Sequence, residues 1–417
     1  MKTAEIDRKW TPSHPELGTG PLLIETCTSE AYFEQERDLI FRRVWLNVGR
    51  VERIPEPSDY FVKDLAVART SIVLVRGRDG VVRAFHNMCS HRGNKLAWAE
   101  GGQARRFTCK FHGWSYDLAG KLVGVPDEDQ FFDFDKREHG LTQISAEVWN
   151  GFIFINLDPQ PKESLEAFLG ELGKQIDGYP FDELSTSHFS YVAEVKVNWK
   201  VAMDAFQEAY HAPFLHKASI AYAFKDKENP LLHGITFQVY PRHHMISLYG
   251  NPEHHPTPVE TVAHRFGPTM IPREVLLERL PAGVNPARSP NWAFDINVIF
   301  PNFNLGARNG TYRTYNFWPL AVDRTLIEIS SYYPRAENPG QRFSREYAKC
   351  VHRDTVMEDL STLEHTQSIL ASGAKSHFVL SDQEVLVRHF HRVVQDYAGS
   401  YEAFCTPKRK SRKVSHV

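Results

Sequence analysis

The spacing of hydrophobic residues divides the chain into parts with different predicted structures. Between residues 30 and 43, apolar side chains recur at roughly helical spacing, which predicts a helix. From about residue 44 to 157, short β-rich runs are punctuated by Gly, Pro and Asp. These runs lie at 45–48, 60–62, 72–75 and 152–155. The pattern predicts a small all-β domain of about a hundred residues.

The pattern changes after the Asp-Pro-Gln-Pro segment at 158–161, which we interpret as a domain boundary. Beyond it, hydrophobic residues at 191–197 alternate as in a strand, whereas those at 198–211 have helical periodicity. Helical periodicity returns at 344–370 and at 382–397. Helices and strands therefore mix in this second part, which we expect to be an α+β domain.

The composition is that of an ordinary globular protein. Lys and Arg number 49 against 51 Asp and Glu, so charge gives no reason to expect nucleic acid or an acidic membrane as a partner. The basic segment at 408–413 is expected to be solvated. No run of about 18 apolar residues predicts a transmembrane helix, and the first residues do not resemble a signal peptide. Five cysteines favour a reducing cytoplasm.

Two short motifs each combine one cysteine with one histidine. Cys89 and His91 form the first, and Cys109 and His112 form the second after 17 intervening residues. Two thiolates and two imidazoles are the ligands of a Rieske [2Fe–2S] cluster. The alternative is a zinc site, but zinc sites usually pair Cys with Cys and His with His. Glycine follows each motif and allows tight turns around a cluster, so we predict a Rieske centre.

A second group of potential metal ligands lies further along the chain. On a helix, Asp204, Glu208 and His211 would be at positions i, i+4 and i+7 and would share one face. Pro213 is expected to end or kink this helix and to bring His216 close to His211. Two imidazoles and a carboxylate form the facial triad of non-haem Fe(II) oxygenases. An ordinary histidine pair is the alternative, but the Rieske motif upstream favours an iron site.

These motifs, with Asn-Trp-Lys at 198–200, resemble the α subunit of Rieske non-haem iron oxygenases, the aromatic-ring-hydroxylating family. The resemblance extends over roughly residues 40 to 395. It implies an α+β fold with an all-β Rieske domain and a helix-grip (START-like) catalytic domain. Accordingly, we expect a helical segment at 1–43 that packs on the catalytic domain. We expect the Rieske domain at 44–160 and the mononuclear-iron domain at 161–417.

The resemblance also supplies the third ligand of the mononuclear iron. The family takes an aspartate from a late helix, and the matching residue here is Asp359. Asp354 and Glu358 are competing candidates, because acidic pairs are common on exposed helices. The implied ligand set is therefore His211, His216 and Asp359.

Glu208 stands where the family places an acidic bridge between subunits. By resemblance, it would contact His112 of a neighbouring subunit and offer an electron path, which requires a closed ring and implies a trimer. The alternatives are a solvated glutamate or a partner of His211. Asp204 replaces the asparagine of many members, so an occasional ligand or a proton carrier remain open roles for it.

The function implied by the resemblance is that of a terminal oxygenase. Such an enzyme uses O2 and electrons from NAD(P)H to dihydroxylate, monohydroxylate or oxidatively demethylate a hydrophobic, often aromatic, substrate. The chain has no dinucleotide-binding fingerprint, so a separate reductase, with or without a ferredoxin, is an expected partner. A homotrimer or a trimer with an added β subunit is expected. The alternatives are a Rieske electron-transfer protein and a zinc-binding scaffold.

The substrate pocket is expected to be lined mainly by aromatic and apolar residues. For each candidate, ordinary core packing is the competing explanation. Arg242, Arg308 and Arg313 are candidates for binding a substrate carboxylate. The apolar and amide candidates are Phe206, Phe214, Leu215, Tyr222, Phe224, Met245, Phe294, Asn297, Ile299 and Phe300.

Overall fold

The computed structural model describes residues 9–267 and 280–405. The N-terminal part contains α1 (Glu30–Glu36), whose first turn is capped by the Ser29 hydroxyl, and a π-helical turn continues it over Arg37–Phe41. Both contact α8 (Val385–Ala398), so the first and last parts of the chain pack together. The two-residue strands β1 (Leu22–Leu23) and β19 (His377–Phe378) also pair. Within the described residues, no helix has the length and apolarity to cross a membrane.

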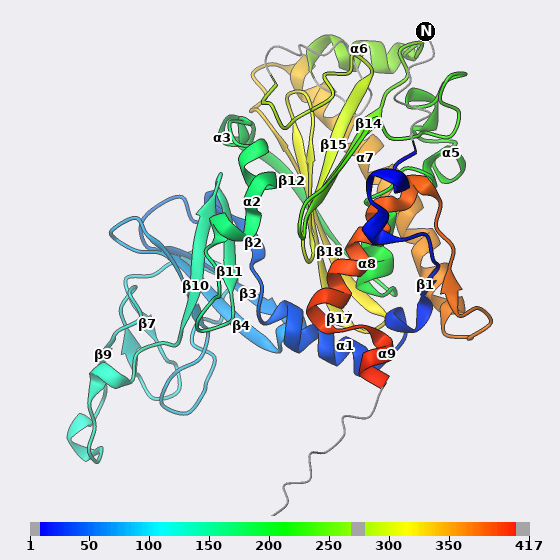
Figure 1. Ribbon diagram of the computed structural model, residues 1–417. Helices are drawn as coiled ribbons and strands as arrows, with labels where there is room; N and C mark the ends of the chain where they lie inside the picture. Colours follow the sequence, from blue (N-terminus) through cyan, green and yellow to red (C-terminus); the bar gives the residue numbers. More distant parts are fainter. Residues whose placement is uncertain (1–8, 268–279, 406–417) are drawn as a thin grey trace, which may run out of the picture.

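The first domain is built on an antiparallel seven-stranded sheet with the order β2-β11-β10-β5-β4-β3-β6. A three-stranded sheet, β7-β8-β9, carries the second Cys-His motif between β7 and β8, whereas the first motif lies in the loop between β5 and β6 of the larger sheet. Both sheets are on the left in Figure 1. The strands are β2 (Leu46–Arg50), β3 (Asp59–Leu65), β4 (Thr70–Arg76), β5 (Val82–His86), β6 (Gly101–Gln103), β7 (Phe107–Thr108), β8 (Ser115–Tyr116), β9 (Leu122–Gly124), β10 (Gln143–Trp149) and β11 (Phe152–Asn156).

The second domain is a curled antiparallel sheet with the order β12-β18-β17-β16-β15-β14-β13, on the right in Figure 1. The long helix α7 (Pro339–Leu370) contacts β12 and α4 (Trp199–Ala205), and α8 contacts β13. This arrangement confirms the predicted α+β fold class. The strands are β12 (Ser187–Val195), β13 (Thr236–Val239), β14 (His244–Tyr249), β15 (Trp292–Ile299), β16 (Phe303–Ala307), β17 (Tyr312–Ala321) and β18 (Arg324–Tyr333). The other helices are α2 (Leu165–Gln175), α3 (Phe181–Leu184), α6 (Pro258–Phe266) and α9 (Tyr401–Cys405).

The single helix predicted over 198–211 is wrong. The Asn198 side chain caps α4 (Trp199–Ala205), which ends seven residues later, and a separate short helix α5 (Ala212–Leu215) follows. Between them, the Glu208 carboxylate accepts hydrogen bonds from the backbone N–H groups of Tyr210 and His211, as a capping residue would. Pro213 lies in the first turn of α5, where its missing N–H costs no helical hydrogen bond, so it helps to begin a helix.

Candidate metal centres and active-site cavity

The two Cys-His motifs form a pair of similar loops. In the first, the Cys89 N–H donates to the carbonyl of Asn94 at 2.9 Å, and the Gly93 N–H donates to Cys89 at 3.0 Å. In the second, Cys109 and Gly113 repeat both bonds, at 2.8 Å and 2.9 Å. Gly93 and Gly113 have φ values of 74° and 75°, a conformation that favours glycine. The flanking glycines therefore shape both loops.

The loops direct the four side chains toward one another. The rings of His91 and His112 are 4.6 Å apart between centroids, and Cys89 and Cys109 are buried. Burial raises the pKa of the Cys109 thiol, but the backbone N–H groups of residues 111 and 112 outweigh it and lower the pKa below its ordinary value. His91 Nδ1 is buried and has no hydrogen-bond partner among the described residues. A nitrogen donor without a partner and a stabilised thiolate fit a Rieske cluster.

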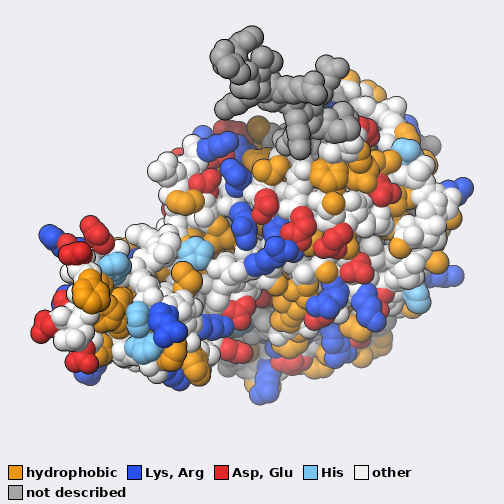
Figure 2. Space-filling model, turned by 90° about the horizontal axis from the view of Figure 1, so that it is seen from below, with side chains coloured by type: hydrophobic (Ala, Val, Ile, Leu, Met, Phe, Trp, Pro, Cys, Tyr) orange, Lys and Arg blue, Asp and Glu red, His pale blue; other side chains and the backbone are white. Residues whose placement is uncertain are grey.

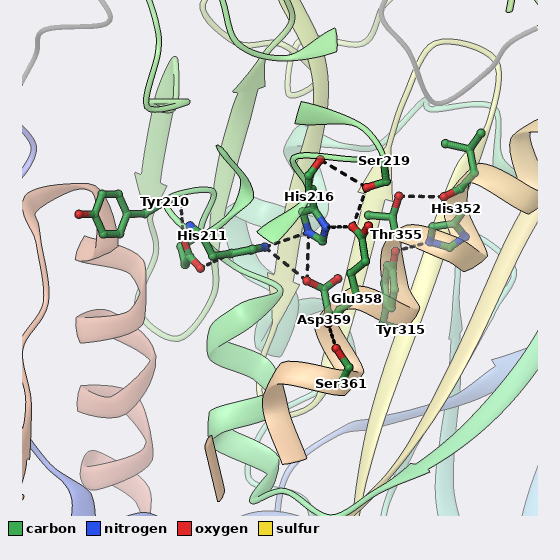
Figure 3. Close-up of polar contacts among 12 residues, drawn as sticks. Tyr210, His211, His216, Ser219, Tyr315, His352, Thr355, Glu358, Asp359 and Ser361 are labelled. Atoms are coloured by element: carbon green, nitrogen blue, oxygen red, sulfur yellow. Dashed lines mark hydrogen bonds and ion pairs between the residues drawn. The ribbon is translucent and has the colours of Figure 1, made fainter. Parts of the chain in front are cut away.

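Three potential iron ligands converge in the second domain (Figure 3). His211 comes from the turn before α5, His216 from its end, and Asp359 from the middle of α7. The two imidazole Nε2 atoms are 3.2 Å apart, and Asp359 Oδ1 lies 3.1 Å from His216 Nε2 and 3.5 Å from His211 Nε2. Asp359 is buried, and one potential ligand atom of each residue lies within 4.8 Å of the others. This donor set suits Fe(II) with open coordination positions.

Two further carboxylates contact the Nδ1 atoms of the two imidazoles, on the side of each ring opposite the converging Nε2 atoms. Glu208 contacts His211 Nδ1, and Glu358 Oε2 lies 2.7 Å from His216 Nδ1. Ser219 donates its hydroxyl proton to the same Glu358 oxygen at 2.6 Å. A carboxylate behind a histidine fixes the ring so that the opposite nitrogen faces the metal. Glu358, a competing ligand candidate in the sequence, thus acts on His216 and points its carboxylate away from the group of ligand atoms.

The electrostatics of the trio suit a cation. Burial alone would lower the pKa of His211, but the Asp359 and Glu208 carboxylates outweigh it and raise the pKa to about 10. Burial would likewise raise the pKa of Asp359, but His211 and His216 lower it below its usual value. The carboxylates therefore create a negative potential at the point where the nitrogens meet. A metal cation there would be stabilised by the same charges.

Asp204 does not line the cavity beside the trio. Its carboxylate lies 2.9 Å from His391 Nε2 and accepts a hydrogen bond from Gln207 Nε2 at 3.0 Å. Since α4 ends at Ala205, the backbone turns before Glu208, and the shared helix face expected for Asp204 and Glu208 does not form. Asp204 is therefore placed to hold α8, which carries His391, against α4.

A cavity of about 120 Å³ opens beside the trio and lies between the curled sheet and α7. From α7 it receives His352, Thr355, Val356 and Asp359, which share one helix face. Tyr315 enters from β17, and its hydroxyl lies 2.5 Å from His352 Nε2. Besides His211 and His216, the remaining wall is formed by Ala205, Phe206, Glu208, Ala209, Ala212, Ile220, Leu248, Phe294, Ile296, Asn304, Gly306, Arg308 and Arg313.

Most of the predicted pocket residues do not line this cavity. Leu248, Phe294 and Ile296 face it from β14 and β15, so Met245, Asn297 and Ile299 point to the opposite sheet face. The prediction of those three was wrong because the direction of a strand residue depends on odd or even position. Phe206 and Phe294 do line the cavity. The residues absent from its wall are Phe214, Leu215, Tyr222, Phe224, Met245, Asn297, Ile299 and Phe300.

Position explains the other wrong pocket candidates. Phe214, on the short helix α5, is 65% exposed, and Tyr222 is 38% exposed and hydrogen-bonds to Glu260. Arg242 pairs with Glu163 and does not line the cavity, whereas Arg308 and Arg313 do. His352 and Tyr315 also line the cavity but were not predicted from the sequence. The spacing of His352, seven residues before Asp359, was the signal that would have placed it on the same helix face.

Two family models match the chain. The Rieske [2Fe–2S] domain matches residues 44–143, and the ring hydroxylating alpha subunit (catalytic domain) matches residues 181–400. The chain is 36% identical over 200 residues to the biphenyl 2,3-dioxygenase subunit alpha of Rhodococcus jostii, which covers 46% of this chain and 43% of that protein. It is 29% identical to the 2-aminobenzenesulfonate 2,3-dioxygenase subunit alpha of an Alcaligenes species over 75% of this chain and 74% of that one.

The chain spans about half the length of most of the curated relatives it matches. Among solved structures, a quaternary ammonium Rieske monooxygenase superimposes with a TM-score of 0.71 at 22% identity. That match covers 91% of this chain and 95% of the other. It therefore supports the fold across both domains.

Proposed function

Because the chain belongs to the ring hydroxylating alpha subunit family and carries a Rieske [2Fe–2S] domain, we propose that it is the terminal oxygenase of a multicomponent system. The observation that carries this proposal is the convergence of His211, His216 and Asp359 on the wall of one cavity. A pure electron-transfer protein has no use for such a site. We therefore propose these three residues as the ligands of the mononuclear iron.

The proposed division of labour follows from the side chains. When bound, the cluster and the mononuclear iron would supply the two electrons and the open coordination positions that dioxygen activation requires. Glu208 and Glu358 hold the two imidazoles in orientation. Apolar side chains such as Phe206 and Phe294 exclude water from the substrate. Tyr315 and His352 provide a polar contact on the same wall.

Electron transfer is proposed to occur between subunits. Within one chain, the cluster domain and α5 lie at opposite sides of the molecule (Figure 1). Figure 2 shows hydrophobic and histidine side chains gathered on the left lobe, which is the cluster domain. Exposed apolar residues there include Met88 at 50%, Trp98 at 58% and Phe111 at 56%. Such a surface suits contact with a neighbouring subunit.

In that arrangement, Glu208 is the proposed link to His112 of the neighbouring subunit. The contact that the chain makes by itself is with His211, so Glu208 would connect the cluster ligand to the iron ligand. A closed ring of three subunits, with or without a β subunit, satisfies this contact. A reductase, alone or with a ferredoxin, is the proposed source of electrons. A cytoplasmic location is proposed from the five free cysteines.

The proposal is tested by oxygen incorporation. The holoprotein, a surrogate reductase and NADH are incubated with ¹⁸O2 and a substrate panel that includes biphenyl, 2-aminobenzenesulfonate and carnitine. The expected result is ¹⁸O in an organic product or in the formaldehyde released by demethylation, and no product from the His211→Ala variant. NADH oxidation without labelled product from any compound, with an intact cluster spectrum, would favour the electron-transfer alternative.

A further inference from the structure

The cavity beside the iron-ligand trio has a strongly basic wall. Arg308 and Arg313 both line it, and their exposed fractions are 4% and 6%. Among the residues that the structure describes, the carboxylates that line the same cavity are Glu208 and Asp359, and both contact His211. Their charge is thus directed to the imidazoles. A buried guanidinium is costly unless an anion or several hydrogen bonds accompany it.

Arg313 lies in β17 two residues before Tyr315, so both side chains point into the cavity. Within residues 9–267 and 280–405, no carboxylate forms an ion pair with it. Its cross-strand neighbour on β16 is Gly306, which has no side chain, and its neighbour on β18 is Ser331. A Cβ at Gly306 would lie 3.8 Å from Arg313 Cβ, in ordinary contact. Glycine there leaves the space beside the Arg313 stem open.

Arg308 lies on the cavity wall between Arg313 and the apolar side chain of Phe294. Its guanidinium carbon lies 4.3 Å from the centroid of the Phe294 ring, which also lines the cavity. Burial and the neighbouring charge of Arg313 lower the pKa of Arg308 well below its usual range. Arg308 and Arg313 are both on this wall, and an anion held between them would interact favourably with both guanidinium groups. The opposite part of the wall, with Phe206, is apolar.

We infer that this cavity binds the anionic group, a carboxylate or a sulfonate, of a small organic substrate through Arg313 and Arg308. Guanidinium groups bind such planar or tetrahedral anions through two parallel hydrogen bonds. The carbon skeleton then lies against Phe206, Phe294 and Leu248, beside the trio. This inference rests on the proposed oxygenase function, because it assigns the substrate class of that same cavity.

The test compares acids with uncharged partners of the same shape. Binding of benzoate and benzamide, benzenesulfonate and benzenesulfonamide, and hexanoate and hexanamide to the holoprotein is measured by calorimetry. We expect at least one acid to bind about 10- to 100-fold more tightly than its partner. The three pairs distinguish aromatic carboxylates, aromatic sulfonates and aliphatic carboxylates. No preference for the acid in any pair would overturn the inference.

Substitutions of Arg313 test whether this residue causes the preference for an acid over its uncharged partner. Arg313→Gln should reduce the acid-to-amide ratio to about 1, and Arg313→Lys should restore part of it. Arg324→Gln is the matched control, because Arg324 is exposed on the next strand and pairs with Glu194. The ratio is measured within each variant, so a lower folded fraction does not change it. A full preference retained in Arg313→Gln would overturn the role of Arg313.

Activity separates this inference from the proposed function. If the holoenzyme oxygenates only uncharged compounds and binds no acid, the anion site is refuted while the oxygenase function stands. If acids bind through Arg313 but no bound compound is oxygenated in a single turnover of the reduced protein, the anion site stands and the oxygenase function fails.

Discussion

Removal of the Glu358 carboxylate is expected to weaken iron binding at a distance from the metal. Glu358 Oε2 accepts a hydrogen bond from His216 Nδ1 at 2.7 Å and another from Ser219 at 2.6 Å. Loss of such an outer carboxylate typically costs 10- to 100-fold in metal affinity, which corresponds to about 1.4–2.7 kcal/mol. The Glu358 side chain is 29% exposed, so water can partly replace it. We therefore expect Glu358→Ala to reduce the affinity for Fe(II) by about 10-fold, near the lower end of this range.

The assay is competition for Fe(II) between the reconstituted protein and a coloured chelator. The visible absorbance of the cluster is the internal reference for folded protein. Glu358→Gln keeps an acceptor oxygen and should lose less affinity than Glu358→Ala. The matched control is Asp354→Asn, since Asp354 lies one turn earlier on α7, is exposed and pairs with Arg353 at 2.7 Å. It should bind iron as the unmodified protein does.

The reasoning is refuted if Glu358→Ala binds Fe(II) as tightly as Asp354→Asn while its cluster spectrum is intact. Parallel loss of the cluster and of the mononuclear iron in Glu358→Ala would also contradict it. Such a result would mean that Glu358 stabilises the whole chain and not the orientation of His216.

Three further changes test other parts of the structure. Gly93→Ala places a side chain at φ 74°, and this strained backbone should destabilise the loop around Cys89 by about 1–2 kcal/mol. The cluster absorbance should then bleach at a lower temperature than in the unmodified protein, and an unchanged bleaching temperature would contradict the predicted strain. Burial lowers the pKa of His389 to about 4, so the neutral imidazole contributes about 3 kcal/mol to the free energy of unfolding above pH 6.5, and this contribution is lost as the pH falls to 4. In urea titrations, the free energy of unfolding of His389→Gln should therefore depend less on pH than that of the unmodified protein, and an equal pH dependence would refute this. Lys200 and Glu36 form a fully buried ion pair at 2.6 Å, so Lys200→Met should lower the free energy of unfolding, measured by thermal unfolding, by about 3–5 kcal/mol. The double variant Lys200→Met/Glu36→Gln should recover part of this loss, and additive effects of the two substitutions would contradict the pairing.

The sequence allowed the fold class and the ligand types to be predicted because local patterns carry both. Strand runs and helical periodicity marked the two domains, and the Cys-His spacing specified a cluster. The six-residue segment between Ala205 and Ala212 was not predictable from periodicity, since residues 198–211 keep helical spacing of apolar side chains. The Glu208 carboxylate stabilises the turn by accepting hydrogen bonds from the backbone N–H groups of Tyr210 and His211. This contact depends on the direction of the Glu208 side chain, which periodicity does not specify.

The cavity was the least predictable part because its walls come from distant segments. Three wrong pocket candidates, Met245, Asn297 and Ile299, lie on the right strands but on the wrong face. Only the pairing of β14 with β15 sets that face. Arg313 was suspected from charge alone, and its burial beside Gly306 depends on the pairing of β16 with β17.

The central claim is that one chain holds two different iron centres, one for electron transfer and one for the reaction. Iron and acid-labile sulfide analysis of the reconstituted protein tests it most directly, with EPR of the reduced cluster. We expect about three irons and about two sulfides per chain, and about two of each in His211→Ala with an unchanged cluster signal. About two irons in the unmodified protein, or loss of the cluster signal in His211→Ala, would contradict the claim.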